Sequence, residues 1–490
     1  MRVFETIKKE GLKELSNLMF ASSKTRRLLM PLALKKLKKR FGRGGDNLYE
    51  LPKELEAQYY YVQALLQTAC QRLDEKLVSP DVLKTVFDSF IDNVFFKGHQ
   101  MKERVYAEKK LEYPTLLVIA PGSRCNLRCK GCYAGSDDRK AAKLDWDTFD
   151  RILTEKEELW SSYFTVLTGG EPFMWADKGK TIYDMFLKHK NQYFMVYTNG
   201  TLLNKENVRK IAEAGNVAPA ISVEGFKKET DWRRGEGVYD RILEAFSNLR
   251  EAGNPFGISA TPMRHNAELL VSDEFIDFYF GKEKAFFGWL FQYMPIGREI
   301  DMDLMVTPEQ RLYMYERSRY IVEKRGLAYV DFWNNGYLSN GCIAAFRKGG
   351  YAYINWDGNV APCAFVPYYT VNIYEIYKNG GDLNTARDCR FFNDVRNWQK
   401  NYGYMQPRHK VGNRLMPCPI RDHHGDMLNI LRKHNVKPLD PFAEEALKSD
   451  RYHEQLIEYN KKVAALLDPV WQSDFAAKNE RPVFENLERL

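Results

Sequence analysis

Between residues 113 and 310 the chain alternates short apolar runs with longer amphipathic segments, and this alternation constrains the fold more than any other feature. The runs have the length of buried strands and lie at 115–120, 164–167, 193–197, 218–223, 257–261 and 286–294. Segments between them, such as 146–160 and 239–252, carry apolar residues at helical spacing. Strand–helix–strand repeats favour right-handed crossovers and a parallel sheet. The sequence therefore predicts an α/β core with six strands, arranged as an open sheet or an incomplete barrel.

The remaining segments lack this regular alternation of apolar runs and amphipathic segments. A chain of 490 residues is also too long for one ordinary compact core. We expect five parts: a basic amphipathic arm at 1–45, a helical N-terminal domain at 46–112, the α/β core at 113–310, a small cysteine-bearing domain at 311–435 and a helical tail at 436–490.

Basic residues are concentrated in the arm. Thirteen Lys or Arg and three Glu give residues 1–45 a charge of +10, whereas the whole chain carries +8. Met30, Leu34, Leu37 and Phe41 share one helical face there. Such a helix can lie on an anionic membrane surface, or pack on the body with its lysines in solvent. Both interpretations stay open at this stage. A nucleic-acid partner is not expected, because the body lacks a basic stripe.

Cysteine usage and hydropathy indicate the compartment. Eight cysteines in 490 residues is too few for a disulfide scaffold. No apolar run reaches the length of a membrane span, and the N-terminus lacks a secretory pattern. We expect a cytoplasmic protein, peripheral at the inner membrane face if the arm binds lipid.

Three cysteines follow the first apolar run directly. Cys125, Cys129 and Cys132 have the spacing Cys-x3-Cys-x2-Cys, with no fourth cysteine nearby. A cubane iron–sulfur cluster normally takes four thiolates, so three leave one iron open to another ligand. A zinc site is the alternative, but structural zinc usually uses two separated Cys or His pairs, and no second pair lies nearby. The triplet therefore favours a cluster.

Further motifs end the next three apolar runs: Thr168-Gly169-Gly170-Glu171-Pro172, Thr198-Asn199-Gly200-Thr201 and Ser222-Val223-Glu224-Gly225. Together with the cysteine triplet they resemble the radical S-adenosylmethionine (SAM) superfamily. The resemblance implies a partial (β/α)6 barrel core with an N-terminal helical extension and a small C-terminal iron–sulfur domain. It also implies a [4Fe-4S] cluster that binds SAM and cleaves it to a 5′-deoxyadenosyl radical, which abstracts hydrogen from a substrate. A flavodoxin- or ferredoxin-type protein is the implied electron donor.

The resemblance also assigns roles to residues. Cys125, Cys129 and Cys132 are the implied cluster ligands. The expected SAM contacts are Gly169, Gly170, Glu171 and Pro172 at the methionine end, and Thr198, Asn199, Ser222 and Glu224 at the nucleoside and radical. Many relatives place an aromatic residue before the third cysteine, where this chain has Gly131, followed by Tyr133 after the cysteine. Tyr293 and Arg298 are candidates for the substrate cavity or for packing.

A second set of cysteines lies in residues 311–435. Asp357-Gly358 between two apolar runs is a hairpin signal, and with Cys342, Cys363 and Cys418 it resembles a SPASM or twitch extension. The resemblance implies one auxiliary iron–sulfur cluster on these three thiolates. For Cys389 two interpretations stay open, a cluster ligand and an ordinary buried thiol. His423 and His424 are further candidates, although a solvated loop is the preferred interpretation for both.

The sequence indicates less about the substrate than about the fold or the cofactors. A basic arm beside an aromatic-rich helical block favours a lipid-like or apolar substrate. A peptide- or protein-modifying maturase is the alternative, and a non-catalytic electron carrier fits poorly because it needs no Gly-Gly-Glu-Pro motif.

Overall fold

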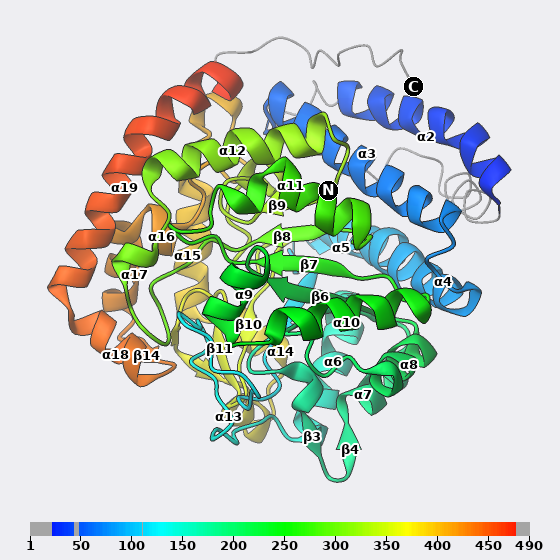
Figure 1. The fold of residues 1–490 in the computed structure, drawn as a ribbon. Coiled ribbons are helices and arrows are strands. Elements are labelled where there is room, and N and C mark those ends of the chain that lie inside the picture. The colour runs from blue at the N-terminus through cyan, green and yellow to red at the C-terminus, as the bar shows by residue number, and fades with distance from the viewer. Residues whose placement is uncertain (1–21, 44–48, 110, 477–490) are drawn as a thin grey trace.

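The computed structural model describes residues 22–43, 49–109 and 111–476, and its centre is one ten-stranded sheet (Figure 1). The strand order is β13-β11-β10-β1-β2-β5-β6-β7-β8-β9. Six neighbouring parallel strands form the middle: β1 (Leu116–Ile119), β2 (Phe164–Leu167), β5 (Tyr193–Thr198), β6 (Val217–Val223), β7 (Gly257–Ala260) and β8 (Gly288–Leu290). All six predicted strands are confirmed, and they form the parallel α/β core of the predicted partial (β/α)6 barrel, whose edge strands β13 and β9 do not pair with each other.

Helices connect these strands and bury the outer face of the sheet. They are α6 (Trp146–Trp160), α7 (Ile182–Lys188), α8 (Lys205–Ala214), α9 (Lys227–Arg234), α10 (Val238–Glu251), α11 (Asp273–Ile276) and the π-helical η6 (Asp277–Lys282). In β1, Leu117 and Ile119 are fully buried in one cluster with Phe149 and Ile152 of α6. Burying such a side chain contributes about 1.5–3 kcal/mol. Because side chains alternate along a strand, the residues between them face the other side of the sheet.

The sheet continues beyond the predicted core at both edges. Strand β9 (Tyr329–Asp331) adds in parallel to β8, and β10 (Tyr353–Ile354) adds in parallel to β1. β10 and β11 (Asn359–Ala361) form the predicted hairpin, with Gly358 at φ +76°, and β13 (Val371–Asn372) pairs with β11. Four strands from residues 311–435 therefore extend the central sheet at its two edges.

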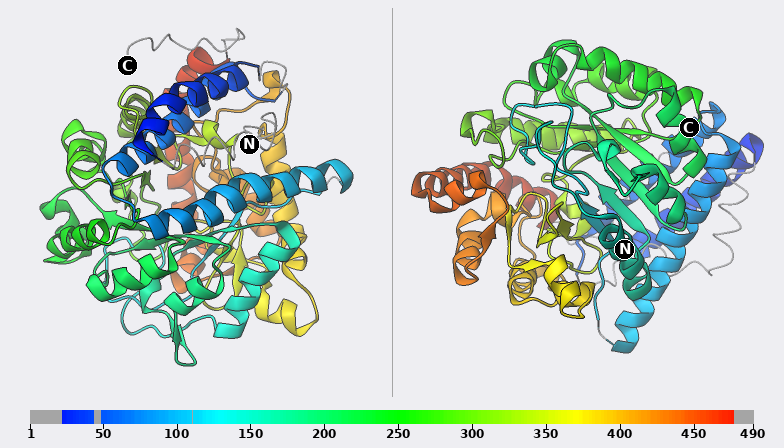
Figure 2. Two further views of the ribbon diagram at one scale, coloured as in Figure 1. Left: turned by 90° about the vertical axis from the view of Figure 1, so that its right-hand side faces the viewer. Right: turned by 90° about the horizontal axis from the view of Figure 1, so that it is seen from below.

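The N-terminal region is helical, as predicted. It contains α2 (Ser23–Arg43), α3 (Pro52–Asp74) and a long rod made of α4 (Pro80–Val86), the π-helical η3 (Phe87–Gly98) and α5 (His99–Lys109) (Figure 2). Phe90 in the rod packs on Tyr193 and Phe164, with ring centroids 4.7 and 5.9 Å apart. Both partners begin their strands, so the rod covers the N-terminal end of the sheet.

The basic arm is described from residue 22 onward. The apolar face of α2 is covered, since Leu37 and Phe41 are buried against Tyr59 and Tyr60 of α3. This is the packed-helix alternative for that segment. The other predicted amphipathic segment, 3–19, lies outside the described residues. No helix in the described ranges is long and apolar enough to cross a membrane.

The C-terminal part is mostly helical, with α19 along the outside of the molecule (Figure 1). Its helices are α12 (Pro308–Glu323), α13 (Ile373–Lys378), α14 (Leu383–Arg387), α15 (Arg390–Asn401), α16 (Pro419–Asp422), α17 (His424–Lys433), α18 (Pro441–Lys448) and α19 (Asp450–Trp471), followed by π-helical η10 (Gln472–Ala476). Short elements complete the fold: β3 (Ala176–Asp177), β4 (Lys180–Thr181), β12 (Tyr368–Tyr369), β14 (Lys437–Pro438) and the 3-10 turns η4 (Pro172–Met174), η5 (Leu269–Val271), η7 (Met302–Leu304), η8 (Gly336–Ser339) and η9 (Arg408–Lys410).

Candidate functional site

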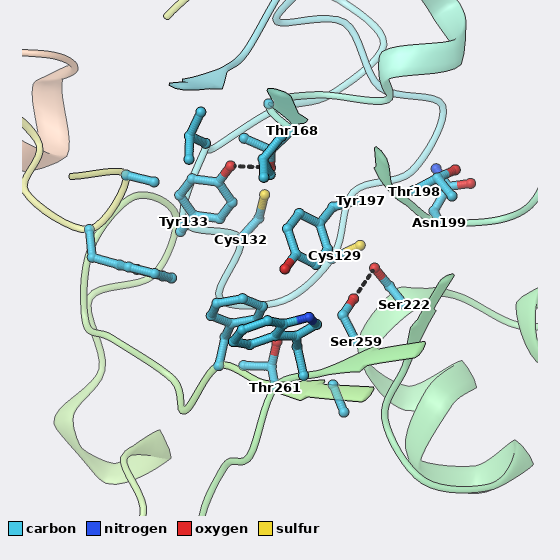
Figure 3. Close-up of a pocket in the computed structure, with 18 of the residues that line it drawn as sticks. Cys129, Cys132, Tyr133, Thr168, Tyr197, Thr198, Asn199, Ser222, Ser259 and Thr261 are labelled. Atoms are coloured by element: carbon cyan, nitrogen blue, oxygen red, sulfur yellow. Dashed lines mark hydrogen bonds between the residues drawn. The ribbon is translucent and has the colours of Figure 1, made fainter. Parts of the chain in front are cut away.

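A cavity of about 340 Å³ opens along the inner face of the six-stranded core, and Figure 3 shows part of its lining. Its walls come from alternate strand residues: Leu116 and Val118 of β1, Phe164 and Val166 of β2, Met195 and Tyr197 of β5, Ser222 of β6, Ser259 of β7 and Trp289 of β8. The loop after β1 (121–133, the cysteine loop) covers the C-terminal ends of the strands, where α/β folds build their sites.

All three cysteines of the triplet line this first cavity. The loop that carries them is held by the backbone, since Cys125 N–H donates to Asp137 O at 3.1 Å and Arg298 N–H donates to Cys132 O at 3.0 Å. Arg298 also donates through its guanidinium to Cys129 O and Ser136 O. Arg298 does not line the cavity, so its role is to brace the cysteine loop.

The thiols fit a cluster better than a single ion. In the described part of the chain no three His, Cys, Asp or Glu side chains are grouped as ligands of one metal ion would be. Three thiols around one cavity instead suit a group with several metal atoms, each bound to one thiolate. Burial, and after it the nearby Glu171 carboxylate, raise the pKa of Cys125 to about 12. Metal binding must therefore displace protons from this site.

The paired glycines lock two loops together. A Cβ on Gly170 would lie 2.2 Å from Arg124 O, and one on Gly169 would lie 2.7 Å from Ala120 Cβ. Gly169 also has φ +108°, which L side chains rarely adopt. We expected these glycines to allow close approach of a ligand; the structure shows that they allow close approach of the cysteine loop itself. Both residues also line the cavity.

We predict that Gly170→Ala weakens the site strongly. Its Cβ meets backbone rather than a flexible side chain, so the cysteine loop must shift, at a cost of about 1–3 kcal/mol. Iron content after reconstitution and the urea midpoint should both fall. Gly281→Ala is the matched control, because nothing lies within 4 Å of its Cβ position. Equal behaviour of the two variants would contradict the prediction.

Glu171 organises the end of β5. Its carboxylate accepts from Thr198 Oγ1 at 2.8 Å and from Asn199 N–H at 2.9 Å. Burial raises the pKa of Glu171 to about 7. Asn199 in turn donates to Asn126 Oδ1 at 2.9 Å and to Cys125 Sγ at 3.8 Å. Glu171, Thr198 and Asn199 all line the cavity, while Pro172 is buried as the first residue of η4.

Glu224 occupies a different position from the one expected. It is fully buried, and it is not among the cavity-lining residues, whereas a SAM contact was expected. Its Oε1 accepts from Arg233 and Arg234, both at 2.5 Å, and its Oε2 accepts from Thr261 N–H at 3.1 Å. Ser222 does line the cavity and bonds Ser259 at 3.3 Å (Figure 3).

Arg233 and Arg234 are site residues that sequence reasoning missed. Both line the cavity, and Arg234 lies 4.0 Å from Cys129 Sγ. They belong to α9, which begins just after the Ser-x-Glu-Gly motif. The sequence feature that could have identified them is the Arg-Arg pair at the end of that helix, because its position allows both side chains to reach Glu224.

The position before the third cysteine is filled from elsewhere in the chain. Gly131 has φ +59°, and a Cβ there would lie 2.7 Å from the Tyr293 ring. Tyr293 lines the cavity and donates to Glu299 O at 2.6 Å. The Tyr293 ring, from the segment after β8, therefore lies beside Gly131, the position at which many relatives carry an aromatic residue. Tyr133 is held by Thr168 at 2.6 Å (Figure 3).

A second cavity, of about 220 Å³, adjoins the first. Cys342, Cys363 and Cys418 line it together, and Trp289, Phe332, Ile343 and Tyr351 line both cavities. Burial raises the pKa of Cys363 to about 12, and Tyr351 Oη lies 2.8 Å from its sulfur.

The other candidate ligands lie outside this cavity. Cys389 precedes α15, and its sulfur lies 3.8 Å from Thr370 Oγ1. His423 contacts Met416 O at 2.8 Å, and His424 is buried against His453 at 2.9 Å. The solvated-loop interpretation is therefore wrong for His424, which is 1% exposed.

Comparison with known proteins agrees with this arrangement. Residues 119–268 match the profile of the Radical SAM superfamily. An AdoMet-dependent heme synthase of Methanosarcina barkeri is 25% identical over 310 residues, covering 56% of this chain and 85% of that protein. The sporulation killing factor maturation protein SkfB of Bacillus subtilis is 23% identical over 261 residues, covering 51% of this chain and 60% of that protein.

Among solved structures, anSMEcpe with bound AdoMet and a peptide aligns with TM-score 0.50 at 15% identity, covering 74% of this chain and 99% of that one, which concerns the fold alone. The superfamily profile runs through the strands that carry the cysteine triplet and the three strand-end motifs, and these relatives are synthases and maturases. The chain therefore contains a radical SAM domain and is an enzyme of the radical SAM superfamily.

Proposed function

We propose that this enzyme abstracts hydrogen from an uncharged, largely apolar substrate held between the cysteine loop and an aromatic wall. The aromatic wall consists of Trp289, Phe291, Phe332 and Phe365, whose rings contact one another at centroid distances of 5.5–6.1 Å. A lipid-like substrate fits this description.

The distribution of charge carries this proposal. Among the described residues that line the first cavity, the charged ones are Glu171, Arg233 and Arg234. Glu171 bonds Thr198 and Asn199, while both arginines bond Glu224 beside Cys129. The aromatic wall and the strand residues opposite it offer no charge. A charged substrate would lose its hydration there without gaining a partner.

SAM bound to a reduced [4Fe-4S] cluster on Cys125, Cys129 and Cys132 supplies the radical chemistry. The chain's own residues position and enclose the site. Gly170 keeps the cysteine loop against the strand ends, and Glu171 is placed to accept from the SAM ammonium once it is ionised. The aromatic wall excludes water, which protects a radical from side reactions.

An auxiliary iron–sulfur cluster on Cys342, Cys363 and Cys418 is part of the proposal. The three thiols meet in one cavity, and the fourth candidate, Cys389, does not line it. Three thiolates would leave one iron open, on a cavity that shares Tyr351 and Ile343 with the substrate site. The ordinary alternative is three buried, inert thiols.

Iron analysis separates these alternatives. The reconstituted enzyme should hold about eight iron atoms, and Cys342→Ala/Cys363→Ala/Cys418→Ala about four, because each cubane contains four. Cys389→Ala should keep the wild-type iron content. Four iron atoms in the wild-type protein would contradict the auxiliary cluster.

The substrate class is tested by 5′-deoxyadenosine formation. The anaerobic enzyme with SAM and dithionite is incubated with lipid, peptide or tetrapyrrole fractions, and product is measured chromatographically. We expect the lipid fraction to accelerate turnover. Acceleration by peptides alone would favour a maturase such as SkfB. A response to tetrapyrroles would point to the chemistry of the heme synthases. Either result would overturn the apolar proposal.

A further inference from the structure

Among the described residues that line the first cavity, two hydroxyls have no hydrogen-bond partner, Tyr197 Oη and Ser136 Oγ. Tyr133 and Thr168 bond each other, Ser222 bonds Ser259, and Tyr293 donates to a backbone carbonyl. In the described part of the chain Tyr197 makes no hydrogen bond through Oη, and its ring contacts Phe291 at a centroid distance of 5.3 Å. Ser136 Oγ is fully buried, so a molecule in the cavity cannot reach it, and Tyr197 Oη is the hydroxyl that a bound molecule can contact.

The Tyr197 side chain points into the cavity. It lies on β5, a central strand, and is partly exposed there while its neighbours Val196 and Thr198 are buried. Figure 3 shows its ring among the lining residues, between the cysteines and the ring groups that face them. Buried tyrosine hydroxyls usually find a partner, so this donor is directed at whatever occupies the cavity.

We propose that the Tyr197 hydroxyl donates a hydrogen bond to the substrate, which therefore combines an apolar body with an acceptor oxygen near the reacting carbon. The acceptor is a carbonyl or ether oxygen, or the oxygen of an alcohol. This inference rests on the proposed apolar substrate and adds the polar group that orients it.

The chemistry of the residue supports donation. Burial raises the pKa of Tyr197 well above its ordinary value, so the phenol keeps its proton. Tyr197 also lies next in sequence to Thr198, which Glu171 holds at the SAM side. A substrate oxygen that accepts from Tyr197 would hold the neighbouring substrate carbon between the SAM side of the cavity and the aromatic wall. Tyr197 is thus a specificity residue, because an apolar wall alone cannot select one carbon over its neighbours.

Two matched probes test the inference on the reconstituted full-length enzyme with SAM and without reductant. They are 4-phenylbutan-2-one and butylbenzene, which differ in one carbonyl. Tyr197→Phe should weaken ketone binding by about three- to tenfold, the loss of one hydrogen bond, and should leave butylbenzene binding unchanged. Tyr183→Phe is the control, since that buried hydroxyl also has no partner among the described residues but does not line the cavity, and both probes should bind as in the wild type.

A spectroscopic readout makes the test independent of the variant's folding. The carbonyl infrared band of the bound ketone should lie at lower frequency in the wild type than in an apolar solvent. Equal effects of Tyr197→Phe on both probes, or an unshifted band, would overturn the role of Tyr197 alone. Failure of both probes to bind the wild type would overturn the apolar substrate site, and this inference with it.

Discussion

Replacing Cys125, Cys129 and Cys132 together by alanine is expected to abolish 5′-deoxyadenosine formation and to remove about four iron atoms per chain. The three thiols line the first cavity, and no group of His, Asp or Glu in the described residues could take over a metal site. The loss should therefore be complete, whereas replacement of a contact residue would leave a fraction of the activity.

Cys70→Ala is the matched control for the triple variant. Cys70 lies on α3, and burial raises its pKa to about 11, as expected of an inert thiol. Its iron content and activity should equal those of the wild type. A triple variant that still binds its full iron and cleaves SAM would show that the cysteine loop does not hold the catalytic cluster.

Glu224→Gln is expected to lower the free energy of unfolding by about 3–5 kcal/mol, the usual cost of removing one partner from a buried ion pair. Glu224 is 0% exposed and its carboxylate faces two guanidinium groups, Arg233 and Arg234. The variant leaves both positive charges without their anion, next to the cysteine loop. We therefore expect iron retention to fall together with the urea midpoint.

The exposed pair Lys227–Asp240 provides the comparison. It joins the start of α9 to α10, and its side chains are more than half exposed. Such surface pairs contribute little, about 0–1 kcal/mol, so Asp240→Asn should shift the midpoint only slightly. If Glu224→Gln behaves like Asp240→Asn, the buried cluster does not stabilise the site.

The fold was largely predictable because its signals are local. Apolar runs of four to nine residues marked the six core strands, and Asp357-Gly358 marked the hairpin. Strand β9 was missed because Tyr329-Val330-Asp331 is only three residues long. The edges of the sheet depend on pairings between β1 and β10 and between β8 and β9, which no local pattern specifies.

The site was predictable only where residues stand in one motif. The cysteine triplet and at least one residue of each strand-end motif line the cavity, but the partners of individual side chains did not follow from spacing. Glu224 was expected to contact the cofactor because its motif ends a strand. Its two arginine partners, nine and ten residues further along the chain, hold its carboxylate in the interior instead. Likewise Tyr197 lies inside an ordinary apolar run, so nothing in the sequence distinguishes its hydroxyl.

The parallel pairing of β1 with β10 has a consequence for biogenesis. Val118 pairs with Tyr353, so the strand that leads into the cysteine loop has one edge unpaired until the ribosome has completed the hairpin far downstream. The triplet is synthesised early, yet its supporting strand is finished late. We expect stable cluster insertion to be a post-translational event, which spares half-made chains from generating radicals.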